Sequence, residues 1–540
     1  MTLIGAQLGT RLGAWGRRLR RVLKNGDLRP RLARTSGAHR ARAGGRLWEL
    51  DPFFYLAAAG LLFCLLLGGG TRGGHLSDAM LQLLTLPLLL AALWRVTDAS
   101  RRRALAWPLA ACAAILALPL LQLMPLPPAL WTRLPGRETI LTAFELLGRP
   151  PAWAPISLAP QSTWLSLLAL LPPLAVFLAV TTLPWRERRL LSLVMIAFAV
   201  TSAFLGLTQL LEGPTSALRF YAVTNASAPV GFFANVNHFA ALLYCALLLV
   251  AAWLANALEE RRYFAKRTRD GARALVPAAV AGFALLVLIC VVVVARSRAG
   301  LVLALVALIA APTLTAPPLR ELKNLASLRL VIAVIALSLL FLGRSALLEA
   351  LERFVGADPL RGRAVMARVT SEAATAFAPV GAGVGAFVPA YAMFEQPEDV
   401  MGAYANHAHN DFLELWLETG VAGPLLLLGF LYWLARQAAR AWRPSNPGPM
   451  AIDRGLIRAA VVIIALLLGH SLVDYPLRTD ALMAVMAFAC ALLIDPPLAP
   501  GDADAPPKAA EGASLSAAST RRESGSRRSS GKNHRQARAS

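Results

Sequence analysis

Apolar runs long enough to cross a membrane recur between residues 53 and 494 of the chain. A helix needs about 18 to 20 apolar residues to cross a hydrocarbon core of ~30 Å. About twelve such runs are present, of which the first and last are the shortest: 53–69, 77–96, 104–124, 163–183, 189–212, 232–257, 275–295, 299–317, 327–343, 412–436, 455–474 and 479–494. The pattern predicts an all-α polytopic membrane protein with about twelve transmembrane helices.

Polar segments divide this pattern into parts. We expect a basic N-terminal arm (1–50), nine transmembrane helices (51–343), a large loop (344–411), three further helices (412–495) and a C-terminal tail (496–540). The arm is polar and rich in Arg, unlike a signal peptide, and is interpreted as a cytoplasmic tail. The C-terminal tail is rich in Ala, Ser, Pro and Arg and predicts disorder.

Composition and charge agree with a membrane location. Of the 540 residues 57% are hydrophobic and 16% charged, with a formal net charge of +23. The basic residues fall in segments that share one side if both termini are cytoplasmic, as the positive-inside rule requires. We therefore assign the charge to topology and to contact with membrane lipids, and expect no nucleic-acid partner. The five cysteines all lie in apolar runs and have no metal-site spacing.

With that topology the large loop 344–411 lies on the outer face, before the tenth helix. Polar sequence with varied chemistry is nearly all on this face. In an earlier outer segment, residues 139–147 predict a short interfacial helix, and the glycines of 379–387 predict a tight backbone turn.

The densest cluster of polar residues lies where the large loop meets the tenth helix. Histidine, whose unperturbed pKa as a residue type is about 6.5, is suited to accept a proton from a hydroxyl, and His409 is the candidate here. Its neighbours are supporting or substrate-binding candidates, although a solvated loop histidine is an alternative for either imidazole: His407, Asn410, Asp411, Glu414 and Glu418. A metal site from His407, His409 and Asp411 is weakly supported, and we expect none.

Arginines on the outer face are candidates to bind an anion. Arg296 and Arg298 occupy a tight turn between two apolar helices, where a guanidinium can grip phosphate or merely reach lipid headgroups. Arg361 and Arg363 of the large loop can close over the same ligand. Salt bridges to nearby glutamates such as Glu372 are the structural alternative for these loop arginines.

Two further segments carry polar side chains at helix ends. Asn237 and His238 follow Asn235 at the start of the sixth helix, where they either cap it or line a polar cavity. At the end of the eleventh helix, Asp474 and Arg478 are expected to pair with each other, either as a structural clasp or as a wall of a site.

Together these residues resemble the O-antigen ligase and polymerase superfamily of bacterial membrane glycosyltransferases. The resemblance rests on the stretch from Asn406 to Asp411 with Gly420-x-x-Gly423, the Ser297-Arg298 turn, the segment 231–237 and the large outer loop. It implies a GT-C-like fold and an undecaprenyl-diphosphate-linked glycan as donor. His409 would be catalytic, while Arg298 and Arg363, with Arg361 and Arg296, would bind the diphosphate.

The resemblance further implies an inverting transfer at the periplasmic face of the inner membrane, with no cofactor and no metal. A ligase for lipopolysaccharide would use lipid A–core or a protein as acceptor. A polymerase for O-antigen or exopolysaccharide would use another glycan, and the sequence does not separate the two. The alternative from another class is a transporter or flippase of lipid-linked sugars. It would place ionisable residues deep within spans, whereas here they gather at outer helix ends.

Overall fold

The computed structural model describes residues 50–71, 73–97, 105–265, 275–314, 358–400, 405–443 and 450–496, with only the backbone at 261–265, 275 and 358–361. The arm expected before residue 50, the span expected at 327–343, parts of the large loop and nearly all of the expected tail lie outside these ranges.

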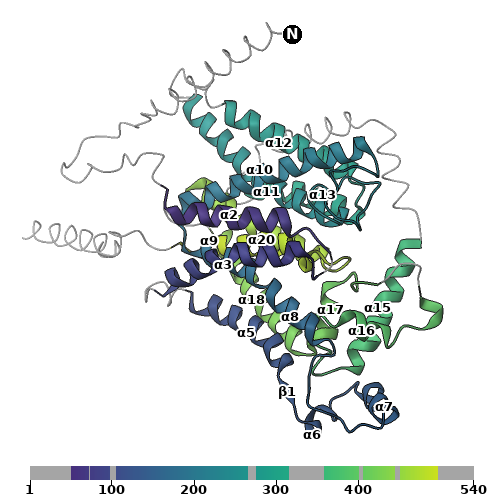
Figure 1. Cartoon of the computed structure of the whole chain (residues 1–540). Coiled ribbons are helices and arrows are strands. Elements are labelled where there is room, and N and C mark those ends of the chain that lie inside the picture. The colour runs from purple at the N-terminus through teal and green to yellow at the C-terminus, as the bar shows by residue number, and fades with distance from the viewer. Residues whose placement is uncertain are drawn as a thin grey trace, which may run out of the picture. The chain divides into compact units, whose positions relative to one another are not determined.

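Helices make up almost all of the regular structure in these ranges (Figure 1). In the first half of the chain they are α2 (Pro52–Leu67), α3 (Leu76–Val96), α5 (Ala106–Leu123), α6 (Pro128–Trp131), α7 (Glu138–Leu146), α8 (Pro160–Ala169), α9 (Leu171–Thr182), α10 (Trp185–Glu212) and α11 (Val236–Ala265). In the second half they are α12 (Leu275–Val294), α13 (Arg298–Ala310), α15 (Asp358–Ala376), α16 (Phe387–Ala392), α17 (Asp411–Thr419), α18 (Ala422–Ala441), α19 (Ala451–His470) and α20 (Asp480–Leu492), with 3₁₀ turns at Ala311–Leu314, Pro397–Asp399 and Pro476–Arg478.

Six of the described helical segments are long and apolar enough to cross a membrane. They are Leu76–Val96, Ala106–Leu123, Pro160–Thr182, Trp185–Glu212, Val236–Glu260 and Val276–Val294. Three shorter apolar helices, Pro52–Leu67, Arg298–Leu314 and Asp480–Leu492, fall at further expected spans. The structure therefore supports an all-α, multi-pass membrane protein, and the total of twelve spans stays a prediction.

One expected span is not a continuous helix. The run 412–436 is divided into α17 and α18 at Gly420, whose φ of 58° lies in the left-handed region. A Cβ atom at this position would lie 1.9 Å from the carbonyl oxygen of Pro379, so the turn requires glycine. The break leaves α17 as a separate nine-residue helix that holds the acidic side chains of the site.

Two groups of helices build the core. Helix α11 packs against α10, α12, α13 and α19, while α3, α9, α2 and α20 pack against one another, as Figure 1 shows. Helices α19 and α20 also contact each other. The polar ends of α11, α13 and α19 and the start of α20 consequently lie close to the segment that precedes α17.

Arg188 fixes the far end of α20. Its guanidinium is fully buried and donates to the carbonyl groups of Thr181, Leu183, Ala491 and Ile494. These carbonyls lie at or just after the C-terminal ends of α9 and α20. At such ends the helix carbonyls lack intrahelical partners and the helix dipole is negative. A buried arginine thus ties two helix ends together.

The described part of the large loop is folded. Helix α15 packs against α17, and Gly381, Gly383 and Gly385 form the expected tight turn, each with positive φ. The amide of Gly383 donates to the carbonyl of Glu418, and that of Gly385 donates to the Glu418 carboxylate. A short helix is also present at the expected position, as α7, between the two-residue strands β1 (Pro125–Leu126) and β2 (Ala154–Pro155), which pair antiparallel; its interfacial position stays a prediction.

Candidate active site

His409 pairs with Asp474, a residue 65 positions further along the chain. His409 Nδ1 lies 3.2 Å from Asp474 Oδ1, and the backbone amide of Tyr475 donates to the same oxygen at 3.0 Å. Asp474 is buried, which acts to raise its pKa, but the hydrogen bond from His409 and the nearby imidazoles hold that pKa well below its usual value. An ionised Asp474 accepts the Nδ1 proton and leaves Nε2 of His409 as the basic nitrogen.

The backbone of His409 is unusual. Its φ of 49° lies in the left-handed region, which side chains larger than glycine rarely adopt. Such conformations persist where surrounding contacts enforce them, and they cluster at functional sites. Asn410, the next residue, holds the segment by capping α17: its Oδ1 accepts from the amides of Phe412 and Leu413. Its Nδ2 donates to the carbonyl of Leu472.

Hydrogen bonds connect the His409–Asp474 pair to the start of α13. Asn237 donates to Asp474 Oδ2 and accepts from the Ser297 hydroxyl at 2.7 Å. Ser297 in turn caps α13 by accepting from the amide of Gly300 at 3.0 Å. Asn235 caps α11, since its Oδ1 accepts from the amide of Asn237, and the side chain of Asn237 faces the polar cluster instead. One network therefore runs from His409 to the residue that precedes Arg298.

The candidate arginines occupy different positions around this network. Arg298 is half-buried and is the first residue of α13, where helix amides also favour an anion. Arg296 precedes it in a turn with φ of 55°. Arg363, on α15, is half-buried and within electrostatic range of His470. The side chain of Arg361 lies outside the described residues.

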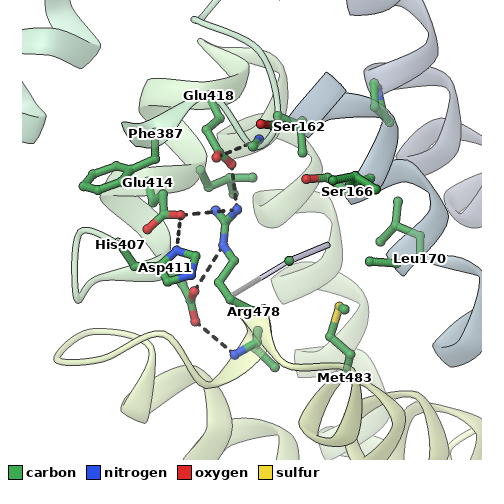
Figure 2. A pocket seen from close by; sticks show the side chains of 18 of the residues that line it. Ser162, Ser166, Leu170, Phe387, His407, Asp411, Glu414, Glu418, Arg478 and Met483 are labelled. Atoms are coloured by element: carbon green, nitrogen blue, oxygen red, sulfur yellow. Dashed lines mark hydrogen bonds and ion pairs between the residues drawn. The ribbon is translucent and has the colours of Figure 1, made fainter. Parts of the chain in front are cut away.

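Arg478 pairs with three carboxylates rather than with Asp474, so the expected Asp474–Arg478 pair is wrong. Its Nη1 lies 2.7 Å from Glu418 and 3.5 Å from Glu414, and its Nε lies 3.5 Å from Asp411 (Figure 2). Burial acts to lower the pKa of Arg478, but the carboxylates outweigh it and raise that pKa further. The four-residue spacing of Asp474 and Arg478 suggested contact, yet the 3₁₀ turn after Tyr475 directs the two side chains to different partners.

The remaining candidates on this helix belong to the same cluster. His407 Nδ1 lies 2.8 Å from Glu414 Oε1. Burial acts to lower the pKa of His407, but the Glu414 carboxylate raises it above its usual value. Burial raises the pKa of Asp411 to about 6, against the opposing effect of Arg478 and of the bond from Ser471. The cluster thus brings Arg478 and His407 together with three carboxylates.

Tyr475 lies between the two clusters and was not singled out from the sequence. Its ring centroid is 4.3 Å from that of His407, 5.0 Å from that of His409 and 4.9 Å from that of His238. His238 is fully buried, and neither of its ring nitrogens has a hydrogen-bond partner among the described residues. The imidazoles that sequence analysis selected therefore gather around one tyrosine ring.

A cavity of about 1100 Å³ opens beside the Arg478 cluster. It is bounded by the loop after α2, by α3, α5, α8 and α18, and by the polar face of α17. Figure 2 shows Ser162, Ser166, Phe387 and Met483 around it, with His407 and the three carboxylates at one end. His409 and Arg298 are not among its lining residues.

We compared the sequence with known protein families. Residues 283–428 match the O-antigen ligase family. The O-antigen ligase match begins in α12, ends in α18 and contains His409, Arg298, Arg363 and all three carboxylates of the Arg478 cluster. Three residues of the two clusters lie outside the matched segment and contact it only in the folded structure: Asn237, Asp474 and Arg478. No curated protein matches the chain.

Proposed function

We propose that the chain transfers a glycan from undecaprenyl diphosphate to an acceptor hydroxyl, as an O-antigen ligase or polymerase. The observation that carries this proposal is the His409–Asp474 pair, connected through Asn237 and Ser297 to the start of α13 and Arg298. A base and an anion site are thus held by one network inside and beside the segment similar to O-antigen ligases.

The transfer is a single displacement with four bond changes. His409 Nε2 takes the proton of the acceptor hydroxyl, whose oxygen forms a bond to the anomeric carbon of the donor. The bond from that carbon to the diphosphate oxygen breaks, and undecaprenyl diphosphate leaves with the electron pair. Attack from the side opposite the leaving group inverts the anomeric carbon. Asp474 stabilises the imidazolium that forms on His409.

The leaving diphosphate gains negative charge during this step. Arg298 and the amides at the start of α13 face that charge, and Arg363 on α15 is the second ligand, with Arg361 and Arg296 as further candidates. Guanidiniums supply the positive charge that a metal ion would supply in other transferases. We therefore expect full activity in the presence of excess chelator.

The proposed location is the periplasmic face of the bacterial inner membrane, with both termini in the cytoplasm and a GT-C-like arrangement of helices. The supports are the excess of basic residues in the segments that would be cytoplasmic and the gathering of the polar clusters at the opposite helix ends. The acceptor is lipid A–core, another glycan or a protein.

A deletion strain tests this function. Loss of a ligase leaves full-length chains on the lipid carrier and removes them from lipid A. Loss of a polymerase leaves single repeat units on lipid A, or removes an exopolysaccharide and spares lipopolysaccharide. Complementation by the wild-type gene but not by His409→Ala is expected. An unchanged polysaccharide profile in the deletion strain would contradict the proposal.

A further inference from the structure

The cavity beside the Arg478 cluster has no part in the displacement just described. At about 1100 Å³ it is slightly larger than the range of roughly 300–1,000 Å³ that is typical of small-ligand pockets. It has a polar end, formed by α17 and the loops around it, and apolar walls from α5 and α18. The cavity therefore has room for more than one sugar residue.

Among the described lining residues, carboxylates outnumber guanidiniums. Five carboxylates line the cavity: Asp78, Asp411, Glu414, Glu418 and Asp480. Arg478 is the one guanidinium among the described lining residues, and three of these carboxylates already surround it. These described groups favour a ligand rich in hydroxyl groups, which would find acceptors here, over an anionic group.

Asp480 is the group that points to a ligand. It is the first residue of α20, is only 8% exposed and lines the cavity. Within the described part of the chain, its carboxylate makes no hydrogen bond or ion pair. The carboxylate faces the cavity, and Asp78, another lining residue, lies within electrostatic range of it. A hydroxyl group of a ligand would supply the missing donor.

Neutral polar groups and aromatic rings complete the lining. Ser162, Ser166 (Figure 2) and Gln82 can each donate or accept a hydrogen bond, and the half-buried ring of Phe430 on α18 also lines the cavity. At the rim, a side chain at Gly73 would meet no atom within 4 Å. Directional polar groups beside a flat ring match a sugar, which presents hydroxyls around an apolar ring face.

The cavity lies near the His409–Asp474 pair without contacting it. Asn406 and His407 line it, and His407 shares the Tyr475 ring with His409. His407 Nε2 also lies 3.3 Å from the carbonyl oxygen of Thr71. This contact connects the loop after α2, at the rim of the cavity, to the segment that precedes α17. His409 and the cavity-lining His407 therefore contact the same tyrosine ring, which brings the cavity near the proposed base.

We propose that this cavity is a subsite for sugar residues of a glycan substrate, bound through their hydroxyls to Asp480 and its neighbours and apart from the diphosphate. The inference rests on the proposed function. The sugars belong either to the donor or to the acceptor, and the two sources are separated by kinetics.

Direct binding tests the subsite independently of transfer. The probe is the repeat-unit oligosaccharide of the producing bacterium, released from its lipid by mild acid and titrated calorimetrically into purified full-length protein. Gly73→Trp is expected to weaken binding at least about 10-fold by filling the rim, while Gly282→Trp on α12, where the added side chain also meets open space, leaves it unchanged. Inorganic diphosphate is expected not to compete.

Kinetics of the Asp480→Ala enzyme identify the source of the sugars. The loss of a hydrogen bond to a charged group is expected to raise the KM of one substrate about 10- to 100-fold with kcat within about twofold. A rise for the lipid-linked donor assigns the subsite to the donor, and a rise for the acceptor assigns it to the acceptor. Asp480→Asn, which keeps an acceptor oxygen, should recover part of the affinity.

The outcomes separate the two proposals. Three binding results would overturn the subsite. They are a wild-type protein that binds no oligosaccharide, a Gly73→Trp protein that binds it as tightly as the wild type, and displacement of the oligosaccharide by diphosphate. Unchanged KM values for both substrates in Asp480→Ala would also overturn it. If the wild type binds the oligosaccharide at this rim but transfers no glycan, the subsite stands and the proposed transferase activity fails.

Discussion

Asp474 Oδ1 lies 3.2 Å from His409 Nδ1 although 65 residues separate the two along the chain. The carboxylate is also held by Asn237 and by the amide of Tyr475, so it cannot turn away from the imidazole. The pair gives His409 a defined tautomer with Nε2 available as a base.

Asp474→Asn is expected to lower the rate of glycan transfer about 100-fold or more, because an amide no longer stabilises the imidazolium and can favour the other tautomer. The KM values should change little, since the side chain does not contact substrate in this account. Steady-state kinetics of the purified variant check this. A variant that loses affinity but keeps its turnover number would show that Asp474 acts on binding instead.

Arg478→Met is expected to destabilise the fold by about 3–5 kcal/mol, because it leaves three buried carboxylates without their cation. Arg368→Met is the matched control. Arg368 also pairs with two carboxylates, Glu372 and Asp399, but its side chain is 48% exposed, and the loss of stability should be much smaller because solvent screens these pairs. Denaturant unfolding of the two variants in detergent compares them, and equal losses would contradict the buried role of Arg478.

The raised pKa of Asp411 predicts a stability that falls with rising pH. Its folded-state pKa of about 6 exceeds the ordinary value of 3.8. The contribution of Asp411 to the free energy of unfolding is therefore fully present below pH 3.8 and is lost as pH rises through 6. The unfolding temperature should therefore decrease between pH 5 and 7, and Asp411→Asn should flatten this part of the profile. A profile that is the same in wild type and variant would rule out Asp411 as the group responsible.

Gly420→Ala is expected to reduce the yield of folded protein and its unfolding temperature. The new methyl group would meet the Pro379 carbonyl, and φ of 58° is strained for alanine. Gly429→Ala in α18 is the control, since a Cβ atom there meets open space and alanine favours the helix. Equal behaviour of the two variants in a thermal melt would mean that the α17–α18 break tolerates a side chain.

The apolar runs predicted most of the helices because hydrophobic length is a strong local signal. The division of 412–436 was missed because α17 and α18 are both apolar and only the approach of Pro379 to Gly420 requires the break. Local sequence likewise selected His409, Arg298 and Asn237. It did not find the partner of His409, since Asp474 and Arg478 suit each other by charge and spacing. Their true partners come from α17 and its preceding segment, which only the tertiary fold brings near.

Glycan transfer by purified His409→Ala tests the central claim most directly. The assay uses lipid-linked glycan from the same bacterium, with Arg298→Ala as a second variant and Arg149→Ala, an exposed arginine outside both clusters, as the control. The account predicts that His409→Ala and Arg298→Ala each lose about 100-fold or more in rate, at normal levels of folded membrane protein, while Arg149→Ala keeps wild-type activity. Near-normal transfer by the His409→Ala enzyme would contradict the account.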